Sequence, residues 1–253
     1  MALVFPFGEG PTDRVVVEFL QDNLFSIKEF REFVPVGGKN QFRSKIHDTV
    51  RSEILPNREI GILVFRDLDA GEYRANIAQA FGDLVGELLS AWNLRPNMKP
   101  LPQHPNIFVC TQSRTMRNPG LRFVLHLADN GALNLPMNLL NHTTDGYVLA
   151  TGLTSAVLER FAGTPHVNTT TQTLFHLITT SLPATVRHAN IAFDQDKDYL
   201  AAYLCATRFW VTRRTEEQAR LVRIVLDRAW RYEQNMVRRI FKTWLAAIEE
   251  ATR

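Results

Sequence analysis

Two short segments of the sequence carry carboxylates beside glycines, at residues 7–13 and 66–72. In the first, Glu9 stands between two glycines that permit a tight turn. In the second, Asp67 and Asp69 are alternate residues, and alternate residues of an extended segment point the same way. Carboxylates that gather at one place repel each other unless a cation neutralises them. Ligation by oxygen alone suits a hard divalent ion, so the two segments predict a site for Mg²⁺ or Mn²⁺.

Each segment taken alone also fits a purely structural role. Asp13 and Asp69 would then be helix caps, and Glu9 would be a solvated turn residue. Both segments occur in one chain, however, and each follows an apolar run. We therefore favour a metal site over a pair of unrelated caps.

Apolar runs and helical periodicities alternate through the first half of the chain. Strands are expected at residues 2–7, 33–36, 60–65, 107–110 and 123–127. Helices are expected at residues 12–25, 42–55 and 72–92. This alternation predicts an α/β fold, with a Rossmann-like, mostly parallel sheet flanked by helices. Sites in such sheets gather at the carboxyl ends of the strands, where both acidic segments lie.

The pattern changes near residue 130. Beyond it the strand signals fade, and helices are expected at residues 153–161, 171–182, 199–209 and 216–251. We therefore predict an α/β metal-binding core at residues 1–130 and a helical region with a basic C-terminal helix at residues 131–253. The long amphipathic C-terminal helix also offers an interface for a homodimer.

Basic residues are concentrated toward the end of the sequence. Residues 201–253 contain 11 Lys and Arg against 6 Asp and Glu, a net charge of +5, although the whole chain carries a formal charge of only +3. This imbalance favours a polyanionic partner such as nucleic acid. A solvated helix face is the simpler alternative. Arg228, Arg231 and Arg239 on the last helix are expected to bind backbone phosphates.

Several other classes of protein are disfavoured. The sequence has no apolar run long enough for a transmembrane helix, so no membrane partner is expected. Its first residues lack the features of a secretory signal, which predicts a cytoplasmic protein. Cys110 and Cys205 are expected to be reduced and buried. The seven histidines form no metal-spaced pair.

The order and composition of these motifs resemble the Toprim domain of topoisomerases, primases and OLD-type (overcoming lysogenization defect) nucleases. The resemblance lies in a strand followed by E-G-P-T-D at residues 9–13 and a strand followed by D-L-D at residues 67–69. The G-G-K-N turn at residues 37–40 and the Asp-Lys pair at residues 196–197 are similar to features of small stand-alone OLD-like proteins. The resemblance covers residues 1–130 and implies a Toprim-like core.

The resemblance also implies roles for the matched residues. The implied metal ligands are Glu9, Asp13, Asp67, Asp69 and Asp129. Glu9 would be a metal ligand or a general acid/base, whereas Asp129 is an additional acidic candidate after the strand at residues 123–127. Lys197 would stabilise charge on the scissile phosphate.

The sequence departs from the family pattern in two places. Small relatives tend to carry a glutamate where this sequence has Asn134, which puts a second metal ion in doubt. No Walker A pattern occurs, so the ATPase half of full-length OLD proteins is missing from this sequence.

The leading hypothesis is a Mg²⁺-dependent (or Mn²⁺-dependent) phosphodiester hydrolase, an endonuclease acting on DNA or RNA. Phage defence is a common setting for the OLD-like proteins that the chain resembles. Lys197, Arg114 or Arg117 would offset the charge that develops in the transition state. The residues expected to contact nucleic acid are Lys39, Arg114, Arg117, Arg228, Arg231 and Arg239.

Two alternatives remain open. A Toprim-like domain without catalytic activity would bind nucleic acid, or an ATPase supplied in trans, and Asn134 favours this interpretation. Nucleotidyl transfer or strand passage within a larger complex is the third option, because a Toprim metal site can serve those reactions too.

Overall fold

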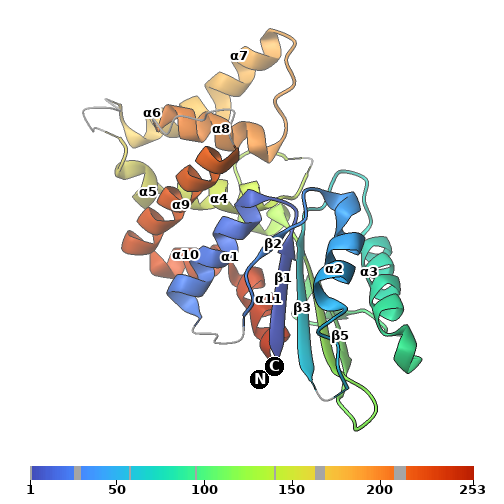
Figure 1. Cartoon of the computed structure of the whole chain (residues 1–253). Helices are drawn as coiled ribbons and strands as arrows, with labels where there is room; N and C mark the ends of the chain where they lie inside the picture. Colours follow the sequence, from blue (N-terminus) through green and yellow to red (C-terminus); the bar gives the residue numbers. More distant parts are fainter. Residues whose placement is uncertain are drawn as a thin grey trace. The chain divides into compact units, whose positions relative to one another are not determined.

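The computed structural model describes residues 2–25, 30–56, 58–94, 96–139, 141–162, 169–207 and 215–253, with side chains in the last range from residue 218 onward. The chain divides into two compact units. The first unit contains Met1–Ala128 together with Lys242–Arg253, and the second contains Asp129–Phe241. Figure 1 identifies the helices and strands of each unit.

The first unit is built on a six-stranded sheet with the strand order β2-β1-β3-β6-β5-β4. Its strands are β1 (Leu3–Gly8), β2 (Val34–Pro35), β3 (Glu59–Arg66), β4 (Lys99–Leu101), β5 (His104–Gln112) and β6 (Gly120–Leu127). The pairs β1–β2, β1–β3 and β3–β6 are parallel, whereas β5 pairs antiparallel with both β4 and β6. The structure thus confirms an α/β fold with a mostly parallel sheet and flanking helices.

The register of the central strands sets the place of the acidic segments. In the β1–β3 pair Phe7 lies opposite Val64, and in the β3–β6 pair Arg66 lies opposite Leu127. The carboxyl ends of these three strands therefore lie at one edge of the sheet. The short strand β4 was not predicted, because three residues with a central proline carry too little strand signal.

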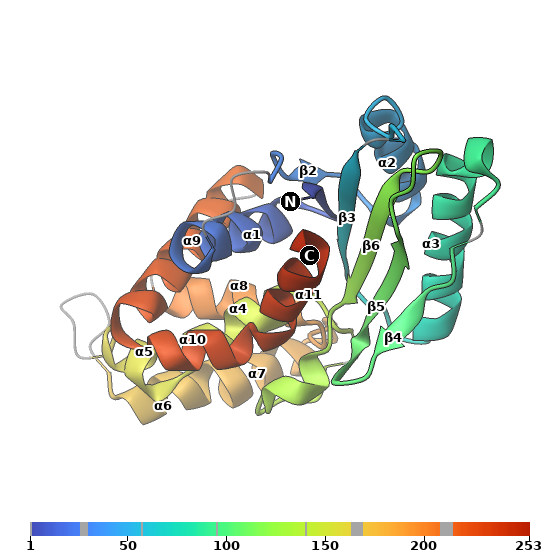
Figure 2. The ribbon, with the colours of Figure 1, turned by 90° about the horizontal axis from the view of Figure 1, so that it is seen from below.

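Helices cover both faces of the sheet. On one face, α2 (Phe42–Val50) and α3 (Arg74–Leu88) bury apolar side chains against β1, β3 and β6. Figure 2 shows α1 (Pro11–Leu24) and α11 (Lys242–Thr252) on the opposite face. Because the inner strands are covered on both sides, their sequences are almost wholly apolar rather than alternating.

The C-terminal helix α11 belongs to the sheet and not to the helical region in which we expected it. Its Trp244 ring stacks on Phe65 of β3 with the ring centroids 4.2 Å apart, and Trp244 is fully buried. The backbone of α11 also approaches β3 closely, since a Cβ atom added to Gly61 would lie 2.5 Å from the carbonyl oxygen of Ala251.

The single helix expected at residues 216–251 is three helices: α9 (Thr215–Tyr232), α10 (Gln234–Ile240) and α11. Non-helical backbone at Glu233, with φ −142° and ψ 54°, separates α9 from α10. An apolar periodicity that continues across such a break does not reveal it.

The second unit is helical. Besides α9 and α10, its helical segments are η3 (Asn130–Leu133), α4 (Thr144–Gly152), α5 (Ser155–Glu159), α6 (Thr171–His176), the π-helical turn η4 (Leu177–Ser181), α7 (Leu182–His188) and α8 (Asp196–Ala206). Its core contains the fully buried rings of Tyr147, Tyr203 and Phe241. Helices α4 and α8 pack closely, because Gly152 leaves room for the ring of Tyr203.

Two expectations about the chain as a whole can be compared with the structure. Among the described residues, no helix has the length and apolar character needed to cross a membrane. Cys110 is buried as expected, but Cys205 on α8 is exposed, so its predicted burial is wrong. The expectation of burial rested on the residue type, which does not decide which face of a helix the cysteine occupies.

Candidate metal site

Glu9 and Asp67 meet at the carboxyl edge of the sheet. Glu9 directly follows β1 and Asp67 directly follows β3, and these two strands are parallel neighbours. The backbone N–H of Asp67 donates a hydrogen bond of 3.1 Å to Oε1 of Glu9. The strand pattern of the sequence therefore predicts the juxtaposition that the structure shows.

The turn after β1 brings Asp13 to the same place. The backbone N–H of Gly10 donates a 2.9 Å hydrogen bond to Oδ2 of Asp13, which closes the first turn of α1. Gly8 is required just before the turn, since a Cβ atom there would lie 2.7 Å from Cβ of Asp13. Asp13 is buried, and its charge acts on Glu9. It therefore serves as a helix cap and still lies within electrostatic reach of Glu9.

Burial raises the pKa of Glu9 to about 7. This value is a net result, to which the negative charge of Asp13 also contributes by raising the pKa, whereas Lys39, the N–H of Asp67 and Arg66 lower it. Glu9 thus changes charge near neutral pH. A carboxyl group of this kind is suited to proton transfer or to binding an ion that offsets its charge.

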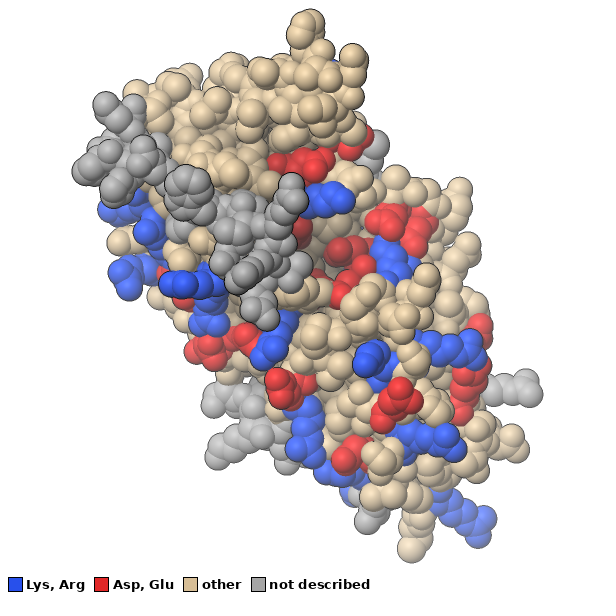
Figure 3. Space-filling model, turned by 45° about the horizontal axis from the view of Figure 1, so that its top comes forward, with Lys and Arg blue, Asp and Glu red and all other residues tan. Residues whose placement is uncertain are grey.

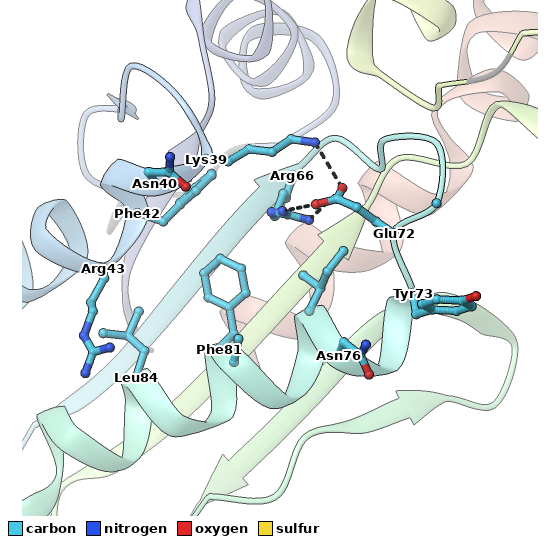
Figure 4. A pocket seen from close by; sticks show the side chains of 13 residues that line it. Lys39, Asn40, Phe42, Arg43, Arg66, Glu72, Tyr73, Asn76, Phe81 and Leu84 are labelled. Atoms are coloured by element: carbon cyan, nitrogen blue, oxygen red, sulfur yellow. Dashed lines mark hydrogen bonds and ion pairs between the residues drawn. The ribbon is translucent and has the colours of Figure 1, made fainter.

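Lys39 connects the carboxylates on the other side of the site. Its Nζ forms an ion pair with Asp69 and a 3.1 Å hydrogen bond with Oε2 of Glu72. Arg66 donates a 2.7 Å hydrogen bond to the other oxygen of Glu72, and Figure 4 shows Lys39 and Arg66 converging on this one carboxylate. Lys39, expected to contact nucleic acid, therefore already has two acidic partners.

These contacts keep Glu72 ionised. Burial alone would raise its pKa, but hydrogen bonds from Arg66, from the backbone N–H of Asp69 and from Lys39 lower the pKa to about 2. Glu72 was not among the predicted site residues. It stands in the same acidic segment as Asp69, three residues on, and that spacing is the only sign of it in the sequence.

The turn that carries Lys39 depends on two glycines. Gly37 and Gly38 have φ angles of +79° and +124°, which residues with a Cβ atom strongly disfavour. The backbone N–H of Gly37 donates a 3.1 Å hydrogen bond to the carbonyl oxygen of Glu9. The turn is thereby fixed beside the first acidic segment, and Lys39 follows it directly.

The site is not a preassembled cage of three carboxylates. Asp69, expected to face the same side as Asp67, is exposed and engaged by Lys39. Within the described ranges, no group of three or more His, Cys, Asp and Glu side chains is arranged to hold a metal ion. The arrangement supplies Glu9 and Asp67, with Asp13 close by and Asp69 held by a lysine.

Arg114 and Arg117 lie at the opposite edge of the sheet. Both precede β6 in an exposed loop, and Gly120 at the start of β6 pairs with Glu59 at the start of β3. The length of an eight-residue strand puts that edge about 25 Å from the carboxylates. The expectation that these arginines offset charge on a phosphate at the acidic segments is therefore wrong.

Asp129 and Lys197 belong to the second unit. Oδ1 of Asp129 accepts a 3.2 Å hydrogen bond from the backbone N–H of Gly131. Lys197 is exposed in the first turn of α8, which begins at Asp196. Asn134 adopts a left-handed backbone conformation with φ 50°.

Asp196 is buried and connects several segments of the second unit through hydrogen bonds. Its Oδ2 accepts hydrogen bonds from Asn130 Nδ2 at 2.9 Å and from the backbone N–H of Thr143 at 3.1 Å, and its Oδ1 accepts one from the N–H of Lys197. Burial raises the pKa of Asp196. The Asp-Lys pair of the sequence therefore consists of an inward structural acid and an outward lysine.

The arginines expected to bind phosphates have different surroundings. Arg228 is half-buried, with its guanidinium 4.6 Å from the ring centroid of Phe161, whereas Arg231 and Arg239 are exposed. On the face drawn in Figure 3, basic side chains of the described residues alternate with acidic ones and do not merge into one continuous basic surface.

Comparisons of the chain with protein-family models, with curated proteins and with solved structures gave no significant match.

Proposed function

We propose that this protein is a Mg²⁺-dependent or Mn²⁺-dependent phosphodiester hydrolase that acts on nucleic acid. The observation that carries the proposal is the hydrogen bond from the backbone N–H of Asp67 to the Glu9 carboxylate, at the carboxyl ends of two adjacent parallel strands. Ligand and catalytic sites of open α/β sheets are formed at such ends.

The donor set fits a hard divalent cation. Glu9, Asp67 and Asp13 offer only carboxylate oxygens, which Mg²⁺ and Mn²⁺ prefer. Ionisation of the partly buried Glu9 is unfavourable, as its raised pKa indicates, and a bound cation would offset that cost. Glu9 and Asp67 would hold the ion, and Asp69 would join them only on release from Lys39.

A bound divalent cation would polarise the scissile phosphate and lower the pKa of an attacking water. Within the chain itself, Oε1 of Glu9 is engaged by the N–H of Asp67, so Oε2 is the oxygen available to a proton. A pKa of about 7 suits proton transfer at neutral pH. Lys39, whose charge acts on Glu9 and which pairs with Asp69 and Glu72, would supply positive charge beside a bound phosphate.

The second candidate is a domain that binds nucleic acid, or an ATPase in trans, without cleavage. The pairing of Lys39 with Asp69 and Glu72 favours it, because the ammonium group already pairs with two of the carboxylates. Binding would then persist without divalent metal and would survive the substitution Asp67→Asn.

A cleavage assay separates the two candidates. The purified full chain is incubated with plasmid, linear DNA, tRNA or total RNA and with Mg²⁺ or Mn²⁺. We expect wild type to cut at least one substrate, and Glu9→Gln and Asp67→Asn to lower the rate by about 100-fold or more. Asp83→Asn, an exposed acid on α3, is the matched control and should cut like wild type.

Equal cutting by wild type, Glu9→Gln and Asp67→Asn would identify a contaminating nuclease and remove the proposal. Binding without cutting, unchanged by Asp67→Asn, would establish the second candidate instead.

A further inference from the structure

A cavity of about 420 Å³ opens in the first unit beside the carboxylates. It lies between α3 and the segment formed by η1 (Lys39–Gln41) and the start of α2, as Figure 4 shows. Lys39, Arg66 and Glu72 line it and also belong to the ion-pair network of the candidate metal site. The cavity and the site therefore share a wall.

The floor of the cavity is apolar and partly aromatic. Phe42 and Phe81 meet edge to face, with their ring centroids 5.6 Å apart, and Ile77 and Leu84 extend the same surface. Figure 4 shows Phe81 and Leu84 projecting from α3 toward the space enclosed by the labelled side chains. A flat apolar group would be desolvated against this floor.

The rim is polar. Asn40 and Asn76 are exposed on two different elements and line the cavity, and each amide offers both a donor and an acceptor. Arg43, on α2, adds a guanidinium at the same rim, although it also pairs with Glu87. Planar apolar faces with donors and acceptors along the edge are the chemistry of a nucleobase, and asparagine amides match base edges well.

We propose that the cavity takes an unpaired nucleobase of the nucleic-acid strand whose phosphate lies at Glu9 and Asp67. The volume is ample for one base with its sugar, and it lies in the range of small-molecule sites. A base stacked in a duplex cannot enter such a cavity, so the substrate class is single-stranded nucleic acid or a duplex with an extruded base. The link to cleavage rests on the proposed function, whereas base binding does not.

The test fills the cavity without touching the carboxylates. Ala80 lies on the exposed side of α3 and lines the cavity, so Ala80→Trp would occupy the space of the base. Ala75→Trp, also exposed on α3 but outside the cavity lining, is the matched control. Thermal melting establishes that both variants are folded.

Binding is measured in EDTA, so that no cleavage occurs. The probes are a short single-stranded oligodeoxynucleotide with one 2-aminopurine, read by its fluorescence, and the same strand with an abasic site at that position, read by competition. We expect wild type and Ala75→Trp to prefer the intact strand by about tenfold, the effect of one stacked base. Ala80→Trp should bind both strands with the same, weaker affinity.

Several outcomes would overturn the inference: wild type binding neither strand, wild type showing no preference for the intact strand, or Ala80→Trp keeping that preference. A cavity that takes a protein side chain instead would leave oligonucleotide binding unchanged in Ala80→Trp. A base preference in EDTA without cleavage in Mn²⁺ would refute the hydrolase and leave the base site standing. Cleavage that depends on Glu9 without any base preference would refute the base site and leave the proposed hydrolase standing.

Discussion

At the scale of single residues, Glu9 has an environment unlike that of a surface carboxylate. It is partly buried, bonded to the N–H of Asp67 and close to the charge of Asp13. Its pKa of about 7 follows mainly from burial. Without a bound cation, ionised Glu9 therefore opposes folding.

This cost gives a prediction about stability and pH. The pKa of Glu9 is about 7 in the folded chain and 4.5 in its ordinary state. Its contribution to the stability of the folded chain is therefore fully present below about pH 4.5 and is lost as the pH rises through 7. In EDTA, Glu9→Gln should therefore be more stable than wild type at about pH 8, by on the order of 2 kcal/mol. Near pH 4.5 the two should have similar stability.

Thermal or urea unfolding at both pH values measures the difference. Asp83→Asn, which replaces an exposed acid, should show no such pH-dependent gain. A Glu9→Gln variant that is no more stable than wild type at the higher pH would mean that Glu9 is solvated and carries an ordinary pKa.

Residue types in the sequence predicted part of this site. Glu9 and Asp67 could be placed together because each directly follows an apolar strand. The partner of Lys39 could not be predicted, since the sequence shows its charge but not that Asp69 and Glu72 would surround it. Arg114 and Arg117 were assigned to the site from charge alone, without the strand direction that places them at the opposite edge.

At the scale of elements, the close approach of α11 to β3 is one of the contacts that join the two segments of the first unit. Gly61 permits it, because an added Cβ atom would lie 2.5 Å from the carbonyl oxygen of Ala251 and 3.1 Å from a methyl group of Val4. The backbone of a packed helix cannot move as easily as the end of a side chain. Any residue larger than glycine at this position must displace α11.

We therefore expect Gly61→Ala to lower the free energy of unfolding by about 1–3 kcal/mol. Gly86→Ala is the matched control, because Gly86 lies within α3 and an added Cβ atom would meet only Pro96 at 3.6 Å. That change should stabilise the protein by about 0.5–1 kcal/mol through helix propensity. Denaturant unfolding measures both, and a Gly61→Ala variant as stable as wild type would show that α11 does not rest on β3 at this distance.

The elements themselves were predictable to different degrees. The buried strand β3 was clear from its uninterrupted apolar run, and α3 from its periodicity. The breaks that divide residues 216–251 into three helices were not, because the apolar period continues through them. The contact of α11 with β3 was not predicted either, because an apolar helix face indicates burial but not the element against which the helix packs.

At the scale of the whole molecule, the first unit is assembled from two segments that are far apart in the sequence. The predicted boundary near residue 130 lies close to Ala128, where the first segment ends. The packing of Lys242–Arg253 against the sheet could not be predicted. Changes of composition along the chain indicate a boundary, but they do not show which distant segments pack together. The sheet edge that bears Glu9 and Asp67 is thus part of a unit completed only when the chain's last helix is in place.

The central claim is that Glu9 and Asp67 together hold a divalent cation, and binding of Mn²⁺ to the full chain tests it most directly. Free Mn²⁺ is followed by electron paramagnetic resonance at about pH 8, where Glu9 is ionised. We predict that wild type and Asp83→Asn bind Mn²⁺, and that Glu9→Gln and Asp67→Asn each weaken binding by about tenfold or more. Equal binding by all four proteins, or none by wild type, would contradict the claim.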